Sequence, residues 1–169
     1  MKRKEARELC MQLVYEMIIK NEFSMAGYQL YQEENPEENP QQGYIRQVLN
    51  TVTEHHDEVD QLIRHYTIDW EMERIARVDM AILRVALAEM QHIDDIPNFV
   101  SVNEAIEMAK KFSTENSSSF VNGILGTYLK DRGEDRLHME DVASEEDAAS
   151  EEDVESEETA ASDETSQKE

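Results

Sequence analysis

Apolar residues recur at three- and four-residue steps along most of the first 133 positions of this chain. The clearest case is residues 3–20, where the repeating positions are Ala6, Leu9, Cys10, Leu13, Val14, Met17 and Ile18. This spacing places the apolar side chains on one face of an α-helix. No stretch alternates apolar and polar residues as a half-buried strand does. The sequence therefore predicts an all-α fold.

The same periodicity predicts about seven helices. They comprise residues 3–20, 23–31, 44–66 and 70–76, two helices that start at Asp79 and Ser101, and one that starts near Phe120. Asp79 is placed to cap its helix, and Ser101 with Glu104 has the spacing of a capping box. Gly133 suits a C-terminal cap. A break at residues 66–69 divides the helices into two packed sub-bundles, which we treat as one domain, residues 1–133.

The remaining segment, residues 134–169, has a different composition. It contains 16 of the 39 acidic residues but only two of the 16 basic ones, so it carries −14 of the net charge of −23. With few large apolar residues it cannot bury enough surface to offset its ordering entropy, and we expect a disordered acidic tail. The tail can serve solubility alone, or it can compete with RNA for a basic surface.

Composition also limits the ligands, the disulfides and the cellular compartment that we expect for the protein. Residues 1–133 keep a net charge of −9, so binding to nucleic acid requires a local basic patch. Cys10 is the only cysteine, which excludes an intrachain disulfide, and its place on an apolar helix face predicts a core residue. There is no signal peptide and no run of roughly 18 apolar residues, so we expect a soluble, cytoplasmic protein.

Polar clusters are present, but they lack the arrangement that catalysis or metal binding requires. His55 and His56 lie within a Glu-His-His-Asp-Glu run, yet neighbouring helical residues point about 100° apart and cannot easily close on one ion. Glu89 and His92 form a single Glu-x-x-His, whereas a carboxylate-bridged di-metal bundle needs two. A Gly-rich phosphate loop is also missing. We predict no metal site, no cofactor and no enzymatic activity.

Two local features favour nucleic-acid binding. The first is a basic N-terminal arm, opposed only by Glu5, that contains Lys2, Arg3, Lys4 and Arg7. Such an arm can neutralise phosphates and release counterions, although a solvated chain end has the same composition. The second is residues 113–120, where hydroxyls, the Asn116 amide and the N–H groups of a helix start can meet phosphates or base edges. Phe120 can stack on an unpaired base or belong to the core.

Several sequence blocks resemble one family, the NusB transcription antitermination factors. Three of them are Asp79-x-x-Ile82-Leu83-Arg84 followed by Glu89, Asn103-Glu104-Ala105-x-x-x-Ala109-Lys110-x-Phe112, and Phe120-Val121-Asn122-Gly123-Ile124-Leu125. An N-terminal block precedes them, Arg7-Glu8-x-x-x-Gln12-x-x-Tyr15. Their order resembles the family over roughly residues 3–129.

The resemblance implies an all-helical fold of two sub-bundles and a role in transcription antitermination. It implies binding to the boxA element of nascent RNA together with NusE, a ribosomal protein of the small subunit. The complex would join other Nus factors on RNA polymerase, chiefly on ribosomal RNA operons. The mechanism would be cooperative tethering, in which a weak RNA binder gains affinity through a second linked contact.

The resemblance also assigns roles to individual residues. The RNA-binding positions are Lys2, Arg3, Lys4, Arg7, Asn116 and Phe120. The positions expected to face NusE are Tyr15 and Asp79. The residues alone leave one alternative open, a helical scaffold that binds only proteins. They also leave open whether the free protein is a monomer or a homodimer.

Overall fold

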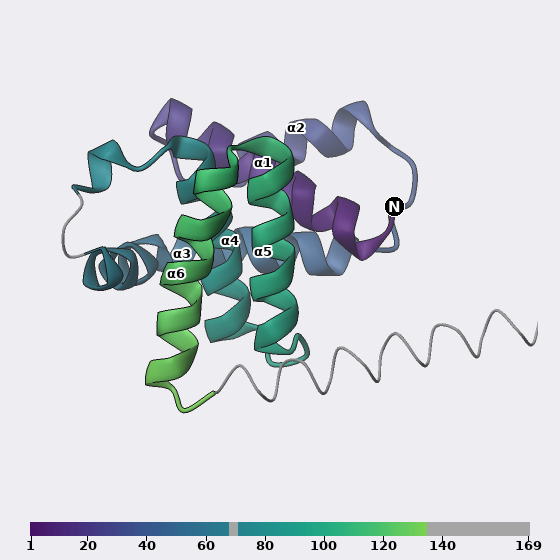
Figure 1. Ribbon diagram of the computed structural model, residues 1–169. Helices are drawn as coiled ribbons and strands as arrows, with labels where there is room; N and C mark the ends of the chain where they lie inside the picture. The colour runs from purple at the N-terminus through teal and green to yellow at the C-terminus, as the bar shows by residue number, and fades with distance from the viewer. Residues whose placement is uncertain (68–70, 135–169) are drawn as a thin grey trace, which may run out of the picture. The chain divides into compact units, whose positions relative to one another are not determined.

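The computed structural model describes residues 1–67 and 71–134. All regular structure in these residues is helical, which confirms the all-α prediction. These residues form six α-helices and one short 3₁₀-helix: α1 (Arg3–Lys20), α2 (Ala26–Glu34), α3 (Gln42–Tyr66), η1 (Met72–Arg74), α4 (Arg77–His92), α5 (Asn98–Phe112) and α6 (Glu115–Asp131). Figure 1 shows how the α-helices are arranged. The predicted acidic tail, apart from its first residue, lies outside the described residues.

Helix α1 has the bounds that its periodicity predicts. Its start is stabilised by the Lys2 backbone N–H, which donates to the Glu5 carboxylate at 2.7 Å. Its end is set by Asn21, which adopts the left-handed conformation (φ 51°) that commonly terminates helices. Cys10 and Val14 are fully buried on the inner face, so the prediction of Cys10 as a core residue is confirmed.

Helices α2 and α3 differ from the sequence prediction in detail. Helix α2 begins three residues later than Phe23, and the Phe23 ring stacks on His56 of α3, with 4.2 Å between ring centroids. Helix α3 is long, as predicted, but it is kinked at His55, whose backbone angles (φ −117°, ψ 15°) are not helical. The predicted helix at 70–76 is the short η1, and Trp70 lies outside the described residues.

Helix α4 is the centre of the fold. It packs against α1, α3, α5 and α6, and Figure 1 shows it behind α5 and α6. Every residue from 79 to 90 is buried. A helix buried all round belongs to the core of a bundle, where polar side chains need partners. The polar residues of α4 are therefore part of the structural core.

Two of the predicted helix caps are wrong. Helix α4 begins at Arg77 after Ala76, whose ψ of 135° is not helical, so Asp79 is the third residue of the first turn and not its cap. Helix α5 begins at Asn98 directly after Pro97, and Ser101 lies inside it. An acidic residue is favourable both at a cap and within the first helical turn, which is why the pattern at Asp79 does not separate these positions.

The last helix begins earlier than its apolar pattern suggests. The Thr114 hydroxyl caps α6 by accepting a hydrogen bond from the Ser117 backbone N–H at 3.1 Å. The other end has Gly133 in the left-handed conformation (φ 74°), which fits its predicted role as a C-terminal cap. Within the described ranges no helix is both long and apolar enough to cross a membrane.

Candidate functional site

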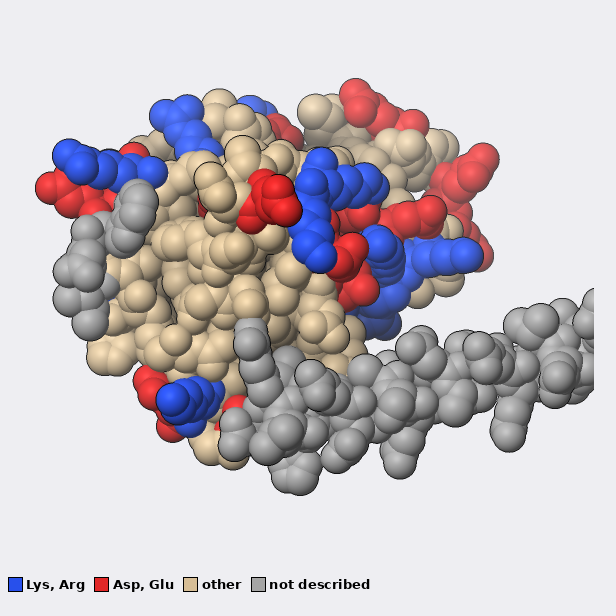
Figure 2. Space-filling model, in the orientation of Figure 1, with Lys and Arg blue, Asp and Glu red and all other residues tan. Residues whose placement is uncertain are grey.

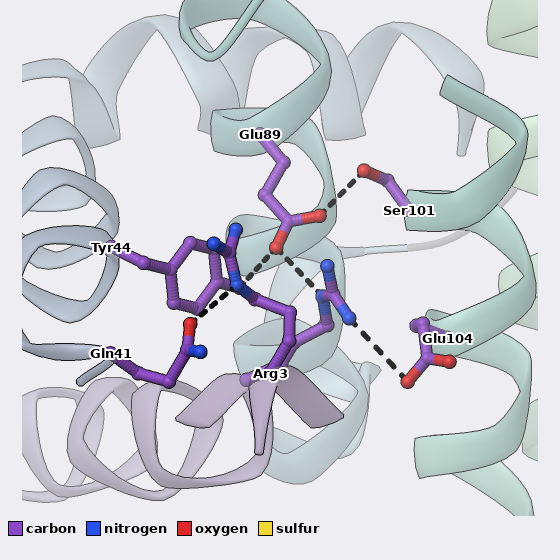
Figure 3. Close-up of polar contacts among 7 residues, drawn as sticks. Arg3, Gln41, Tyr44, Glu89, Ser101 and Glu104 are labelled. Atoms are coloured by element: carbon purple, nitrogen blue, oxygen red, sulfur yellow. Dashed lines mark hydrogen bonds and ion pairs between the residues drawn. The ribbon is translucent and has the colours of Figure 1, made fainter. Parts of the chain in front are cut away.

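A fully buried carboxylate joins four helices. Glu89 of α4 is 0% exposed, and its Oε1 accepts hydrogen bonds from Arg7 Nε of α1, at 2.7 Å, and from the Tyr44 hydroxyl of α3. Its Oε2 accepts a hydrogen bond from Ser101 Oγ of α5 at 2.5 Å. Figure 3 shows these side chains converging on Glu89. We call Arg7, Tyr44, Glu89 and Ser101 the Glu89 network.

The network keeps its charges paired. Burial is the largest influence on the pKa of Arg7 and would lower it, but Glu89, Tyr44 and Glu104 together outweigh burial and raise that pKa. Burial, followed by the charge of Glu89, raises the pKa of Tyr44. Arg7 therefore remains cationic and Tyr44 remains a neutral hydroxyl donor. A second carboxylate, Glu104, lies 3.5 Å from Arg7 Nη1.

Arg7 is predicted to bind RNA, but the structure places it inside the protein. Its side chain is 3% exposed and is committed to Glu89 and Glu104. Arginine is the cation best suited to buried ion pairs, because its planar guanidinium offers several donors in fixed directions. In this conformation Arg7 does not reach the surface, so its role here is to fix α1 against α4 and α5.

The rest of the basic arm is exposed and lies at the start of α1. Lys2, Arg3 and Lys4 are all exposed. Arg3 donates from Nε to Gln41 Oε1 at 2.7 Å, and its guanidinium carbon lies 4.2 Å from the centroid of the Tyr44 ring. Tyr44 therefore contacts two arginines, with its hydroxyl in the Glu89 network and its ring face against Arg3 (Figure 3).

Some of the polar side chains at the start of α6 are buried or form hydrogen bonds within that turn. Ser117 and Ser118 are buried, and Ser118 Oγ donates to the Glu115 carbonyl at 2.7 Å. Asn116 remains exposed and Phe120 is half-buried. Of the residues expected to bind RNA here, Asn116 is thus on the surface, and Phe120 presents only part of its ring.

A lysine outside the predicted site residues lies between the two predicted RNA-binding segments. Lys111, near the end of α5, forms an ion pair with Glu8 of α1 at 2.7 Å. Glu8 is one helical turn from Lys4, and α6 begins four residues after Lys111. The ion pair therefore brings the start of α6 toward the basic arm. The adjacent pair Lys110-Lys111 is the sequence signal that points to it.

Most of α6 is free of charge. Residues 116–129 of α6 include no charged side chain, although a third of the whole chain is charged. Figure 2 shows a broad uncharged area over α6, and beside it, toward the N-terminal end of α1, Lys and Arg side chains interspersed with Asp and Glu. A polyanion would meet little repulsion there, in contrast to the acidic average of the protein.

The two residues expected to face a protein partner differ in accessibility. Tyr15 is 37% exposed, and Ile19, one turn further along α1, is 48% exposed. Together they form a small apolar stripe on the outer side of this helix. Asp79 is only 4% exposed, and its Oδ1 has no hydrogen-bond partner among the described residues. In this conformation Asp79 Oδ1 is therefore not exposed to a partner.

Comparison with known proteins identifies relatives that span the described helices. Residues 4–130 match the family model described as the NusB family. The transcription antitermination protein NusB of Alkaliphilus oremlandii is 43% identical over 133 residues, which cover 79% of this chain and 96% of that protein. The protein of the same name from Clostridium novyi is 39% identical, covering 77% of this chain and 99% of its own length.

Solved structures agree with this fold. NusB of T. maritima superposes with a TM-score of 0.70 at 28% identity, over 77% of this chain and 92% of that one. A crystal structure of the antitermination factors NusB and NusE in complex with dsRNA contains a chain that matches with a TM-score of 0.67 at 23% identity, covering 76% of this chain and 96% of that one. At that identity the second match supports the fold alone.

Proposed function

Because this chain belongs to the NusB family, we propose that it is a transcription antitermination factor that binds boxA RNA together with the ribosomal protein NusE. Other Nus factors and RNA polymerase would complete the assembly, mainly on ribosomal RNA operons. The observation that carries the proposal is a local basic edge beside an uncharged helix face, in a chain whose net charge is −23. The role is binding without catalysis, and we expect it in the cytoplasm.

The RNA-binding surface combines charge with hydrogen-bonding groups. It consists of Lys2, Arg3, Lys4, Lys111, Asn116 and the exposed part of Phe120. The cationic side chains would neutralise phosphates and release counterions, which gives affinity without sequence preference. Asn116 and the Phe120 ring supply the hydrogen bond and the stacking that single-stranded bases can use. The lysines thus position the RNA, and the start of α6 reads it.

Arg7 supports this surface from below. Its ion pair with Glu89 ties the first turns of α1 to α4, and α5, which carries Lys111, packs on the same helix. A basic arm held on a helix loses less conformational freedom on binding than a flexible tail would. We therefore assign Arg7 a positioning role in place of the phosphate contact that the family resemblance implies.

NusE would dock on the outer side of α1. Tyr15 with Ile19 is an exposed aromatic and aliphatic pair of the kind that anchors protein interfaces. Asp79 lies beneath the surface. We therefore propose that it supports NusE binding indirectly, through the negative charge that it places in the first turn of α4, where helix N–H groups converge. Charge complementarity to a basic partner would then come from the exposed acidic residues of the surface.

The decisive experiment is RNA binding with and without the partner. Fluorescence anisotropy of a labelled boxA RNA is measured against the full chain at moderate salt, alone and with saturating NusE. We expect weak binding alone and a gain of at least about tenfold with NusE, since linked contacts raise effective concentration. Binding that NusE does not enhance would contradict the proposal and favour a scaffold that binds only proteins.

Matched variants test which residues bind RNA and which bind NusE. Lys111→Ala should weaken RNA binding at low salt, whereas Lys20→Ala, at the other end of α1, should leave it unchanged. Tyr15→Ala should weaken NusE binding and spare the weak binding of RNA alone. Asp79→Asn, which keeps the shape of the side chain, should leave NusE affinity within about twofold if Asp79 makes no direct charge pair.

A further inference from the structure

Three side chains that could ligate a metal converge from two helices. His55 and Glu58 belong to α3, and His92 is the last residue of α4. One potential ligand atom from each lies within 4.8 Å of the other two. The rings of His55 and His92 are stacked with 4.2 Å between centroids, and His55 Nδ1 is 3.4 Å from Glu58 Oε2.

The kink of α3 accounts for this arrangement. Neighbouring helical residues point in different directions, and the non-helical backbone of His55 occurs where its ring meets α4. His56 is used elsewhere, since its Nδ1 lies 3.0 Å from the Thr53 carbonyl and its ring stacks on Phe23. Only one of the two adjacent histidines therefore faces His92.

The register between the two helices is fixed nearby. Asp60 of α3 accepts two hydrogen bonds from Arg84 of α4, from Nε and Nη2, both at 2.9 Å. Both side chains are largely buried, and a two-point contact of this kind sets orientation as well as distance. The three potential ligands are consequently presented by two helices whose register is fixed, which favours a metal site.

His92 also has an unsatisfied ring nitrogen. Its Nε2 is buried and has no hydrogen-bond partner among the described residues. An unpaired buried polar atom is costly and calls for an explanation, such as a bound ion. In addition, His92 terminates α4, where the carbonyl ends of the helix favour a positive charge.

We propose that His55, Glu58 and His92 bind a divalent transition-metal ion, with Zn²⁺ as the best match. Two imidazole nitrogens and one carboxylate oxygen are ligands that zinc takes at about 2.0–2.2 Å in a tetrahedral site. The two imidazoles are stacked, and a ring nitrogen binds a metal in the plane of its ring, so one imidazole would turn on binding to let both nitrogens meet the ion. Glu58 is 66% exposed and can rotate to close the site, and water can occupy the fourth position. The ion would tie the kink of α3 to the end of α4.

The test is a calorimetric titration of Zn²⁺ into the full chain, freed of metal by a chelator and kept in excess Mg²⁺. Magnesium occupies sites made of carboxylates alone, whereas histidine nitrogens prefer zinc. We expect one saturable site. His55→Ala and His92→Ala should each weaken it by at least about tenfold, because even removing a residue that only supports a metal ligand has an effect of this size.

His56→Ala is the matched control and should bind Zn²⁺ as the unmodified chain does. Glu58→Gln guards against misfolding, since this exposed side chain can change without disturbing the core, and it should weaken binding several-fold. Absence of a saturable site would overturn the proposal. Equal losses in His55→Ala and His56→Ala, or unchanged binding in Glu58→Gln, would overturn it as well.

Discussion

Arg3 and Arg7 lie one helical turn apart on α1, yet their surroundings are opposite. Arg3 is exposed, donates to Gln41 and lies over the face of the Tyr44 ring. Arg7 is buried and paired with Glu89, which also accepts from the hydroxyl of the same Tyr44. One arginine is available to a ligand, and the other is fully engaged within the fold. Burial, and not residue type, thus decides which part of a basic segment can bind.

The largest effect on stability should come from removing Glu89, the hydrogen-bond acceptor of the Glu89 network. Glu89→Ala leaves the Arg7 charge buried without its partner, so we expect the free energy of unfolding to fall by about 3–5 kcal/mol. Urea denaturation followed by circular dichroism measures it. Glu107→Ala, at an exposed ion-pair residue of α5, is the control and should cost less than about 1 kcal/mol. Similar losses in both variants would remove the distinction between buried and exposed pairs.

Tyr44→Phe separates the two functions of one side chain. The variant loses the hydroxyl that donates to Glu89 but keeps the ring against Arg3. Hydrogen bonds to charged groups contribute about 1.5–3 kcal/mol, and we expect the free energy of unfolding to fall by that amount. RNA affinity in the presence of NusE should stay unchanged in the folded variant. A loss of affinity without a loss of stability would show that the hydroxyl belongs to the binding surface.

The same tyrosine predicts a pH dependence. Its folded-state pKa is raised by burial and by Glu89, so the stabilisation it contributes is complete below its unfolded pKa of about 10. As pH rises above that value, the unfolded state loses its proton first, and stability declines by up to about 1.4 kcal/mol per pH unit. The free energy of unfolding, plotted from about pH 9 to 11, should therefore fall less steeply for Tyr44→Phe. Identical slopes would contradict a neutral buried hydroxyl.

Replacing the exposed residues of the basic arm should have the smallest effect on stability. Replacing Lys2, Arg3 and Lys4 together with alanine should hardly change the urea midpoint, because these side chains are exposed. Binding to boxA RNA should weaken, and the slope of log affinity against log salt should fall by roughly 0.7 for each phosphate that the variant no longer neutralises. An unchanged slope would mean that these residues are a solvated chain end.

Much of the fold can be predicted from local pattern. The bounds of α1, the burial of Cys10 and the long α3 follow from apolar spacing, because periodicity reports directly which face a helix buries. The starts of α4 and α5 do not follow. Ser101 has the spacing of a cap, but its hydroxyl bonds to Glu89, and nothing local to residues 101–104 reveals a partner in the preceding helix.

The candidate site can be predicted only in part. Lys2, Arg3, Lys4 and Asn116 are exposed, as a binding role requires. In the sequence, Arg7 looks like part of the basic arm. Its partner is 82 positions away, and local spacing does not reveal a pairing over that distance. His55 and His92 lie in two separate polar runs of the sequence, whereas the fold pairs them with each other. Tertiary pairing is the information that single segments lack.

The central position of α4 has a consequence for how the chain is made. Its buried surface is completed by α1 and α3, which precede it, and by α5 and α6, which follow it. During synthesis from the N-terminus, the first helices are made before Glu89, and Glu89 is made before Ser101. The Glu89 network can therefore form only after Ser101 has been synthesised. Apolar surface then stays open until the last helix leaves the ribosome, and long-range closure of this kind slows folding. The nascent chain is thus most vulnerable to aggregation just before its last helix emerges.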